Sequence, residues 1–172
     1  MRWLIWAMVL IGAFGIMRAI FSASEDREEW MRWAPSVDLT KLEDGAQAEI
    51  VWNGRLWVVR ALTPEQVEAV SSIPPDELSD PEPIADRLLR VEVLDRTRWF
   101  AVVAPRGRHC ILAVTDDGWR DNCYFGRWDL AGRIYRRQGL DNANLAIPNF
   151  VVRNNTLHLR PDQPASRPSI RQ

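Results

Sequence analysis

The sequence predicts a mostly β fold, an antiparallel β domain preceded by one transmembrane α-helix. Three observations support this fold class: an apolar segment at residues 3–17, an Asn-Gly pair at 53–54 between two β-rich segments, and short runs of β-branched and aromatic residues in the rest of the chain. The chain has 172 residues, which is enough for an anchor and one domain with its own core. We therefore expect a single globular domain.

The composition argues against a nucleic-acid-binding protein. The 22 basic and 23 acidic residues nearly cancel, and no block of one sign is long enough for a nucleic-acid arm or an acidic tail. Nine Trp residues are many for this length and suit a membrane interface or an aromatic β core. Cys110 and Cys123 are close enough in sequence to pair across one loop, and a single pair does not by itself identify a metal site.

The N-terminal apolar segment is long enough to span a membrane. Residues 3–17 are apolar throughout, and three further apolar residues follow Arg18. If the Arg18 side chain extends to the interface, residues 3–23 cross a hydrocarbon core of about 30 Å. Tryptophans suited to interfacial belts lie at both ends, at Trp3, Trp6, Trp30 and Trp33. We predict an anchor at 1–23 and a neck at 24–36.

Cleavage and orientation of this segment stay open at this point. Fifteen apolar residues behind a short basic start also describe a secretory signal, although Phe21 is unfavourable three residues before a break after Ala23. The arginines around the segment are Arg2 before it and Arg18, Arg27 and Arg32 after it. Their count alone would place the domain in the cytoplasm.

The rest of the chain predicts short strands, one helix and a long loop. The β-rich runs predict strands at 37–42, 48–52, 55–62, 88–94, 98–103, 111–115, 132–136, 149–152 and 156–160. Thr63 is placed to cap a helix that continues to Val70, with Pro64 at its first position. Residues 71–86 contain four Pro and five acidic residues and predict a surface loop. His158 is expected to be an ordinary strand residue.

Four motifs follow one another between residues 105 and 148. They are PRGRHC at 105–110, GWRDNCYFGRWD at 118–129, AGRIYR at 131–136 and NLAIP at 144–148. Their order resembles the Rieske iron–sulfur proteins of quinol:cytochrome c reductases, which read Cys-x-His-x-x-Cys, then Gly-Trp-x-Cys-x-Cys-His-Gly-Ser-x-Tyr-Asp, a Gly-Arg strand and an Asn-Leu-x-φ-Pro turn. With VDLTKLEDG, WNGRLWVVR and TPEQ upstream, the resemblance covers residues 37–160 and implies a Rieske-like β domain there, followed by a flexible tail at 161–172.

The resemblance implies a site that has lost its cofactor ligands. The two disulfide cysteines of the family fall on Cys110 and Cys123. The four [2Fe–2S] ligands fall on residues that are neither Cys nor His, namely Pro105, Gly107, Asp121 and Tyr124. The two hydroxyls that tune the cluster fall on Gly126 and Trp128, and the covering loop falls near 138–142, without Pro. We therefore predict no bound cofactor, no metal and no catalytic residue.

The same residues leave other interpretations open. A structural disulfide would close a loop of about fourteen residues and contribute about 3 kcal/mol. The cysteines could instead form a redox-active thiol pair, or join Asp121 and His109 in a different metal site. The arginines of the two loops are either a solvated surface or a partner-binding tip for carboxylates or lipid phosphates; they are Arg106, Arg108, Arg120 and Arg127.

The sequence thus predicts a cluster-free, non-enzymatic accessory subunit of a respiratory membrane complex, with cytochrome b among the expected partners. An iron–sulfur electron carrier and a periplasmic thiol–disulfide protein are the alternatives. The resemblance and the possible disulfide favour a single-pass protein of the bacterial inner membrane with its domain in the periplasm. The start Met1-Arg2-Trp3 lacks the Arg-Arg pair of a twin-arginine signal, which agrees with a domain that has no cluster to insert before export.

Overall fold

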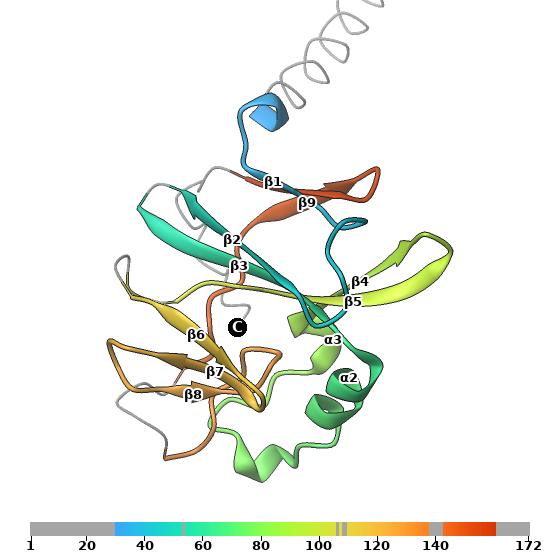
Figure 1. Cartoon of the computed structure of the whole chain (residues 1–172). Helices are drawn as coiled ribbons and strands as arrows, with labels where there is room; N and C mark the ends of the chain where they lie inside the picture. The colour runs from blue at the N-terminus through green and yellow to red at the C-terminus, as the bar shows by residue number, and fades with distance from the viewer. Residues whose placement is uncertain (1–29, 53, 106, 108–109, 138–142, 161–172) are drawn as a thin grey trace, which may run out of the picture. The chain divides into compact units, whose positions relative to one another are not determined.

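The structure is a computed structural model that describes residues 30–52, 54–105, 107, 110–137 and 143–160 (Figure 1). The chain forms two compact units, Met1–Ala34 with Arg160–Gln172, and Pro35–Leu159. The predicted anchor at 1–23 and the predicted tail at 161–172 lie outside the described residues. In the first unit the described part contains the 3₁₀ helix η1 (Trp30–Arg32). Within the described ranges, no helix is long and apolar enough to cross a membrane.

The unit Pro35–Leu159 consists of three antiparallel sheets, which confirms the mostly β fold. The first sheet has the order β1 (Ser36–Asp38), β10 (Thr156–Leu159) and β9 (Phe150–Arg153). The second has the order β2 (Gln47–Trp52), β3 (Arg55–Leu62), β5 (Arg96–Val103) and β4 (Leu88–Val93). The third has the order β6 (Leu112–Thr115), β7 (Gly118–Asp121) and β8 (Arg127–Trp128).

Local sequence signals account for the β2–β3 hairpin and for helix α2 (Pro64–Ser71). Trp52 pairs with Arg55, so the two strands are joined by the predicted two-residue turn, and Gly54 supplies the positive φ of 70°. At α2 the Thr63 hydroxyl accepts a bond from the Gln66 backbone N–H, and the Gln66 side chain accepts one from the Thr63 N–H. This reciprocal capping box confirms the predicted helix start.

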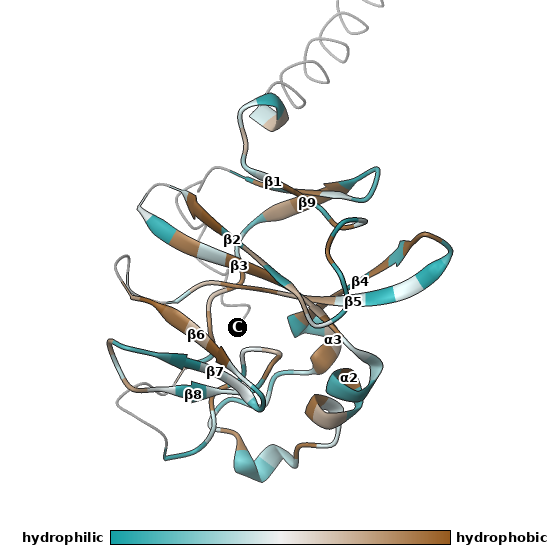
Figure 2. Cartoon of the chain, in the orientation of Figure 1, coloured by the Kyte–Doolittle hydropathy of each residue, from teal (hydrophilic) through white to brown (hydrophobic). Residues whose placement is uncertain are grey.

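The four-stranded sheet separates two hydrophobic clusters. On β3, Val58 belongs to one cluster while its neighbours Trp57 and Val59 belong to the other, as expected when side chains alternate across a strand. The first cluster also contains Trp119 and Trp128 from the third sheet. The second contains residues of the first sheet, such as Leu157 of β10. Figure 2 shows hydrophobic colouring along β3 and β6 and hydrophilic colouring on parts of β7 and β8.

The loop predicted at 71–86 contains two short helices, η2 (Pro75–Glu77) and α3 (Ile84–Arg87). Each follows a proline, at Pro74 and Pro83, whose fixed φ suits the chain entering a helical turn. The prediction of one continuous loop was therefore wrong, because it treated prolines only as breakers.

The strand predicted at 132–136 was also wrong, and the strands β7 and β8 were not predicted. Only isolated bridges form there, from Ile134 to Trp128 and from Tyr135 to Leu78. Gly132 has a positive φ of 78° and donates its N–H to the Asp129 carbonyl, so the chain turns at the point where a strand was expected to begin. Strands β7 and β8 were missed because they are short and rich in charged residues.

Candidate functional site

Two loops at one end of the third sheet form the candidate site. One precedes β6 and the other joins β7 to β8, and the disulfide Cys110–Cys123 connects them with a Cα–Cα distance of 5.6 Å. The disulfide predicted from the resemblance is thus present. We call the described residues of these loops the tip, and they are Pro105, Gly107, Cys110, Ile111 and residues 121–126.

The Asp121 carboxylate organises the second loop. Its side chain is buried at the end of β7, where Oδ1 accepts the backbone N–H groups of Tyr124 and Gly126, both at 3.1 Å. Next to it, the Asn122 Oδ1 accepts the N–H of Ile111 at 2.8 Å and links the loop to the other one. A carboxylate that already accepts two N–H groups makes strong charge-assisted bonds and holds the loop in one conformation.

Two glycines of the tip have no room for a side chain. A Cβ atom on Gly107 would lie 2.3 Å from the Sγ of Cys110, and one on Gly126 would lie 2.1 Å from the Trp128 ring. At these positions the resemblance implies an imidazole ligand and a hydroxyl. The disulfide sulfur and the indole ring fill the space that such groups would need.

These observations show that the described residues do not fit a [2Fe–2S] cluster. Such a cluster takes two thiolates and two imidazoles, whereas Pro105 and Gly107 offer no donor and Asp121 is bound to its own loop. Both cysteines are in the disulfide. In the described part of the chain, no three His, Cys, Asp or Glu residues come together to hold a metal ion. His109 of the alternative metal site lies outside the described residues.

The outward-facing part of the tip is apolar, and two arginines lie on the strands next to it. Phe125 is 71% exposed and Ile111 is 63% exposed, and Tyr124 beside them is also exposed. Arg120 on β7 is exposed, whereas Arg127 on β8 pairs with Asp117 across the sheet. The other two predicted tip arginines, Arg106 and Arg108, lie outside the described residues.

A buried arginine anchors the segments that support the tip. Arg87 at the end of α3 is 5% exposed. Its Nε donates to the carbonyl of Ala131 at 3.1 Å, and its Nη2 donates to the carbonyls of Gly132 and Leu145 at 3.0 and 2.8 Å. Burial lowers the pKa of Arg87, and the nearby Glu82 carboxylate opposes that shift. The guanidinium therefore serves as a structural hydrogen-bond donor for three carbonyls.

A second buried pair lies beside it, between Asp129 and Arg133. The Asp129 carboxylate, with no exposed surface, accepts the Arg133 N–H at 2.8 Å and the Arg133 Nε at 2.7 Å. Arg133 also donates Nη2 to the Val70 carbonyl at 2.6 Å. Burial raises the pKa of Asp129, and the bonds from Arg133 counteract it.

Asn144 completes this buried network. It accepts the N–H of Ile134 at 2.8 Å and donates to the Asp80 carbonyl and to Glu82 at 3.0 and 2.9 Å. Sequence reasoning did not assign roles to Asp129, Arg133 or Asn144, although each lies within a matched motif. The motifs showed where these residues occur, and only the folded structure shows that they meet.

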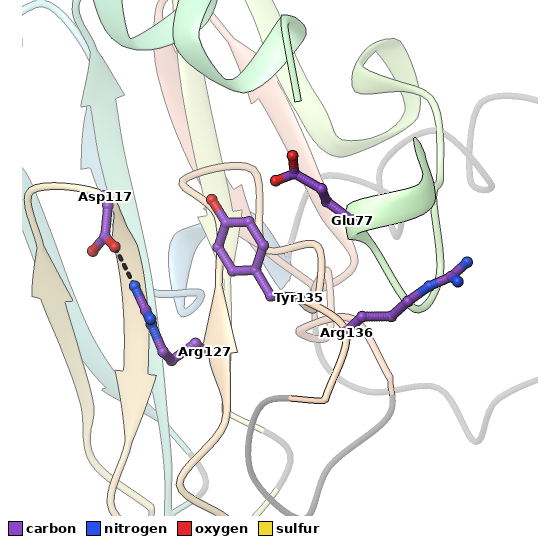
Figure 3. Close-up of a pocket in the computed structure, with 5 residues that line it drawn as sticks. All are labelled: Glu77, Asp117, Arg127, Tyr135 and Arg136. Carbon is purple, nitrogen blue, oxygen red and sulfur yellow. Dashed lines mark hydrogen bonds and ion pairs between the residues drawn. The ribbon is translucent and has the colours of Figure 1, made fainter. Parts of the chain in front are cut away.

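An open cleft of about 470 Å³ lies on the side of the third sheet, lined by Glu77, Asp117, Arg127, Tyr135 and Arg136 (Figure 3). The figure shows the Arg127 guanidinium directed at Asp117, with Tyr135 beside this pair. Burial raises the pKa of the Tyr135 hydroxyl, and the Asp129 and Asp117 carboxylates add to that effect. Two acidic and two basic side chains balance each other, so the cleft has no preference for an anion or a cation.

Comparison with known proteins decides the family. No protein-family model matches the chain. A relative from Schizosaccharomyces pombe, the mitochondrial cytochrome b-c1 complex subunit Rieske, is 24% identical over 83% of this chain and 65% of its own length. The subunit of the same name from Neurospora crassa is 32% identical over 66% of this chain and 48% of its own length. The chain belongs to the Rieske iron–sulfur protein family.

A third relative, the mitochondrial cytochrome b-c1 complex subunit Rieske-3 of Nicotiana tabacum, is 27% identical over 78% of this chain and 49% of its own length. The chain thus spans roughly half to two thirds of the length of these Rieske relatives. Family membership agrees with the three antiparallel sheets and with the disulfide between the two tip loops. The assignment of Pro105, Gly107, Asp121 and Tyr124 to former ligand positions stays a prediction from the motif register.

Proposed function

We propose that this chain is a cluster-free Rieske protein that acts as a non-catalytic accessory subunit of a respiratory membrane complex such as a quinol:cytochrome c reductase. One observation carries the proposal: the former ligand positions now serve the loops themselves. The Asp121 carboxylate accepts two backbone N–H groups, and Gly107 lies against the disulfide sulfur. In this proposal the domain keeps its β sheets, and its tip contacts a partner protein instead of holding a cofactor.

The proposal includes a membrane anchor at residues 1–23 and a domain on the periplasmic side of a bacterial inner membrane. A disulfide persists in an oxidising compartment, and the Cys110–Cys123 pair supports that placement. The apolar segment at 3–17 supports the anchor. The names of the relatives support a respiratory complex as partner, with cytochrome b among the candidate contacts.

Iron and labile-sulfide analysis of the full chain, purified from membranes, tests the absence of a cluster. We expect no stoichiometric iron and no Rieske-type absorption or electron paramagnetic resonance signal. The Neurospora crassa relative, purified in the same way, is the positive control for cluster retention. Iron and sulfide in stoichiometric amounts with a Rieske spectrum would overturn the proposal and establish the electron-carrier alternative, which the names of the relatives favour.

Affinity capture from gently solubilised membranes tests the accessory role. We expect subunits of a quinol:cytochrome c reductase or an oxidase to co-purify in fixed ratio with the chain. A chain that runs alone under conditions that keep such complexes intact would contradict the role.

The thiol–disulfide alternative rests on the exposed Cys123 and is tested by alkylation with and without mild reductant. Failure of both cysteines to label after mild reduction would exclude it.

A further inference from the structure

Exposed apolar side chains gather at the tip. Of the seven large hydrophobic residues that are exposed in the described part of the chain, three are Ile111, Tyr124 and Phe125. Phe125 at 71% is the most exposed of these three. Ile111 belongs to the other loop of the tip, and its N–H donates to the Asn122 Oδ1 of the Phe125 loop at 2.8 Å. Nothing in the described residues covers this apolar surface.

The backbone at Phe125 is held in an unfavourable conformation. Its φ is +54°, a left-handed region that costs a bulky L-residue about 1–2 kcal/mol. The motif of the resemblance has Gly at this position, where no such cost arises. Several bonds oppose relaxation of the loop: Asp121 accepts the N–H groups of Tyr124 and Gly126, on both sides of Phe125, and the disulfide holds Cys123. An aromatic side chain that is exposed and held in a strained backbone conformation indicates a functional role for that residue.

We propose that Phe125, flanked by Tyr124 and Ile111, is a preorganised anchor that inserts into an apolar pocket of a protein partner whose rim carries carboxylates. The inference rests on the proposed accessory function and names the surface that would perform it. A rigid aromatic residue that loses little conformational freedom on binding is the typical centre of a protein interface. The partner-binding surface predicted from the arginines thus also includes the apolar side chains of the tip.

Charge determines the expected rim of the partner pocket. Arg120 is exposed and forms no ion pair with the described acidic residues. Asp121 is the one acidic residue in 105–111 and 120–127, and its carboxylate is buried under the loop. The outward-facing surface of the tip is therefore apolar, with the positive charge of Arg120 next to it, which complements an apolar pocket edged by Asp or Glu.

The fixed loop favours a protein over a lipid surface as the partner. A bilayer accepts apolar side chains in many orientations, and binding to it gains little from a single strained conformation. A pocket of defined shape gains affinity when the inserted residue is already in place. Contact with lipid would be recognised in crosslinking from residue 125 by adducts to lipid alone.

The hairpin between β4 and β5 offers a matched control. Leu94 is 65% exposed and has a φ of +51°, nearly the same exposure and conformation as Phe125. Phe125→Asn and Leu94→Asn each replace an exposed apolar residue by one that tolerates the left-handed region. We expect both full-length variants to fold with unchanged or slightly raised thermal stability.

The first measurement is photo-crosslinking from residue 125 in native membranes. Benzoylphenylalanine replaces Phe125 in the full chain, and in a parallel strain it replaces Leu94. We expect the probe at 125 to join one apolar peptide of one membrane protein, with Asp or Glu nearby, and the probe at 94 to give no such adduct. Adducts to lipid alone, or equal adducts from both positions, would overturn the proposal.

The second measurement compares the variants in retention by the crosslinked protein. Loss of a central aromatic anchor weakens binding by about 30-fold, so Phe125→Asn should abolish co-migration on native gels while Leu94→Asn leaves it intact. Arg120→Glu should weaken it to a lesser degree. Equal retention of Phe125→Asn and wild type in a respiratory complex would contradict the anchor and leave the accessory function standing.

Failure of the proposed accessory function would give a different result from failure of the Phe125 anchor. If residue 125 joins a membrane protein outside any respiratory complex, and Phe125→Asn abolishes that contact, then the anchor stands and the proposed partner class is wrong.

Discussion

The tip and the buried network of Arg87, Arg133 and Asn144, which we call the support, are stabilised by bonds that cover very different distances along the sequence. In the support, Arg87 bonds to Leu145, Arg133 to Val70 and Asn144 to Asp80, with separations of 58, 63 and 64 residues. In the tip, the Asp121 bonds have separations of 3 and 5 residues, and the disulfide has a separation of 13. The support joins remote segments, and the tip is largely held by its own neighbours.

This difference allows residues of the tip to change while the domain persists, as the proposed function requires. When one residue that joins remote segments changes, several segments lose a hydrogen-bond partner at once. A loop held by local bonds can change individual residues, as we propose for the ligand positions, while it keeps its disulfide and without disturbing the sheets. The four predictions that follow test this contrast, beginning with the largest effect.

Removal of the buried charge partner should damage the whole domain. Arg133→Ala leaves the Asp129 carboxylate buried without its counter-ion, which costs about 3–5 kcal/mol in the free energy of unfolding. Urea unfolding of the full chain in detergent measures it. The control is Lys41→Ala in the exposed pair with Asp38, where the lysine side chain is 83% exposed; a much smaller loss is expected there, because water screens exposed pairs. Equal losses in the two variants would contradict the contrast.

Removal of the disulfide should destabilise the tip more than the support. The double variant Cys110→Ser and Cys123→Ser opens the short loop that they close, at a cost of about 3 kcal/mol. In hydrogen-exchange measurements we expect faster exchange at residues 121–126 and unchanged exchange at Gly132 and Leu145. Loss of protection at both places to the same extent would show that the tip is not an independent unit.

Removal of the Asp121 carboxylate should loosen the same loop by a smaller amount. Asp121→Ala leaves the N–H groups of Tyr124 and Gly126 without their acceptor, which costs about 2 kcal/mol. Asp121→Asn keeps an oxygen in place and should lose less. Thermal unfolding of both variants measures the difference, and a neutral Asp121→Ala would refute the role of Asp121 in the loop.

The smallest effect is expected at Asp117, on the turn between β6 and β7. Bonds from the Thr115 hydroxyl, and then from Arg127, hold the pKa of the Asp117 carboxyl below its usual 3.8. Because the folded-state pKa is lowered, this pairing stabilises the protein above pH 3.8 and is lost as the pH falls through the folded-state pKa. Wild type should therefore lose more stability than Asp117→Asn on acidification, by urea unfolding at a series of pH values. Identical pH profiles would show that the pairing contributes nothing.

Several elements could be predicted because their signals are local. The turn at Gly54 needs only a positive φ between two strands, and α2 needs only the capping pair of Thr63 and Gln66. The disulfide followed from the motif register of two loops. In contrast, β7 and β8 carry Arg120 and Arg127 on an exposed face and lack the apolar alternation by which strands are recognised.

The tip shows the same division. The residues at the predicted ligand positions 105, 107, 121 and 124 can be read in the sequence, and so can the arginines around them. The sequence does not show that Asp121 turns inward to bind its own loop, or that Phe125 points outward in a left-handed conformation. Sequence reasoning therefore favoured charge at the tip and overlooked its apolar centre.

The sequence by itself determined the fold class, the hairpin, the capped helix and the residues available to a cofactor, because periodicity, turns and donor atoms are properties of neighbouring residues. Tertiary structure alone decided which polar groups are buried together and which apolar ones are left outside. Arg87, Arg133 and Asn144 reach the carbonyls of Leu145, Val70 and Asp80 only after segments about 60 residues apart pack around one core. Burial and exposure depend on that packing, and no local pattern encodes them.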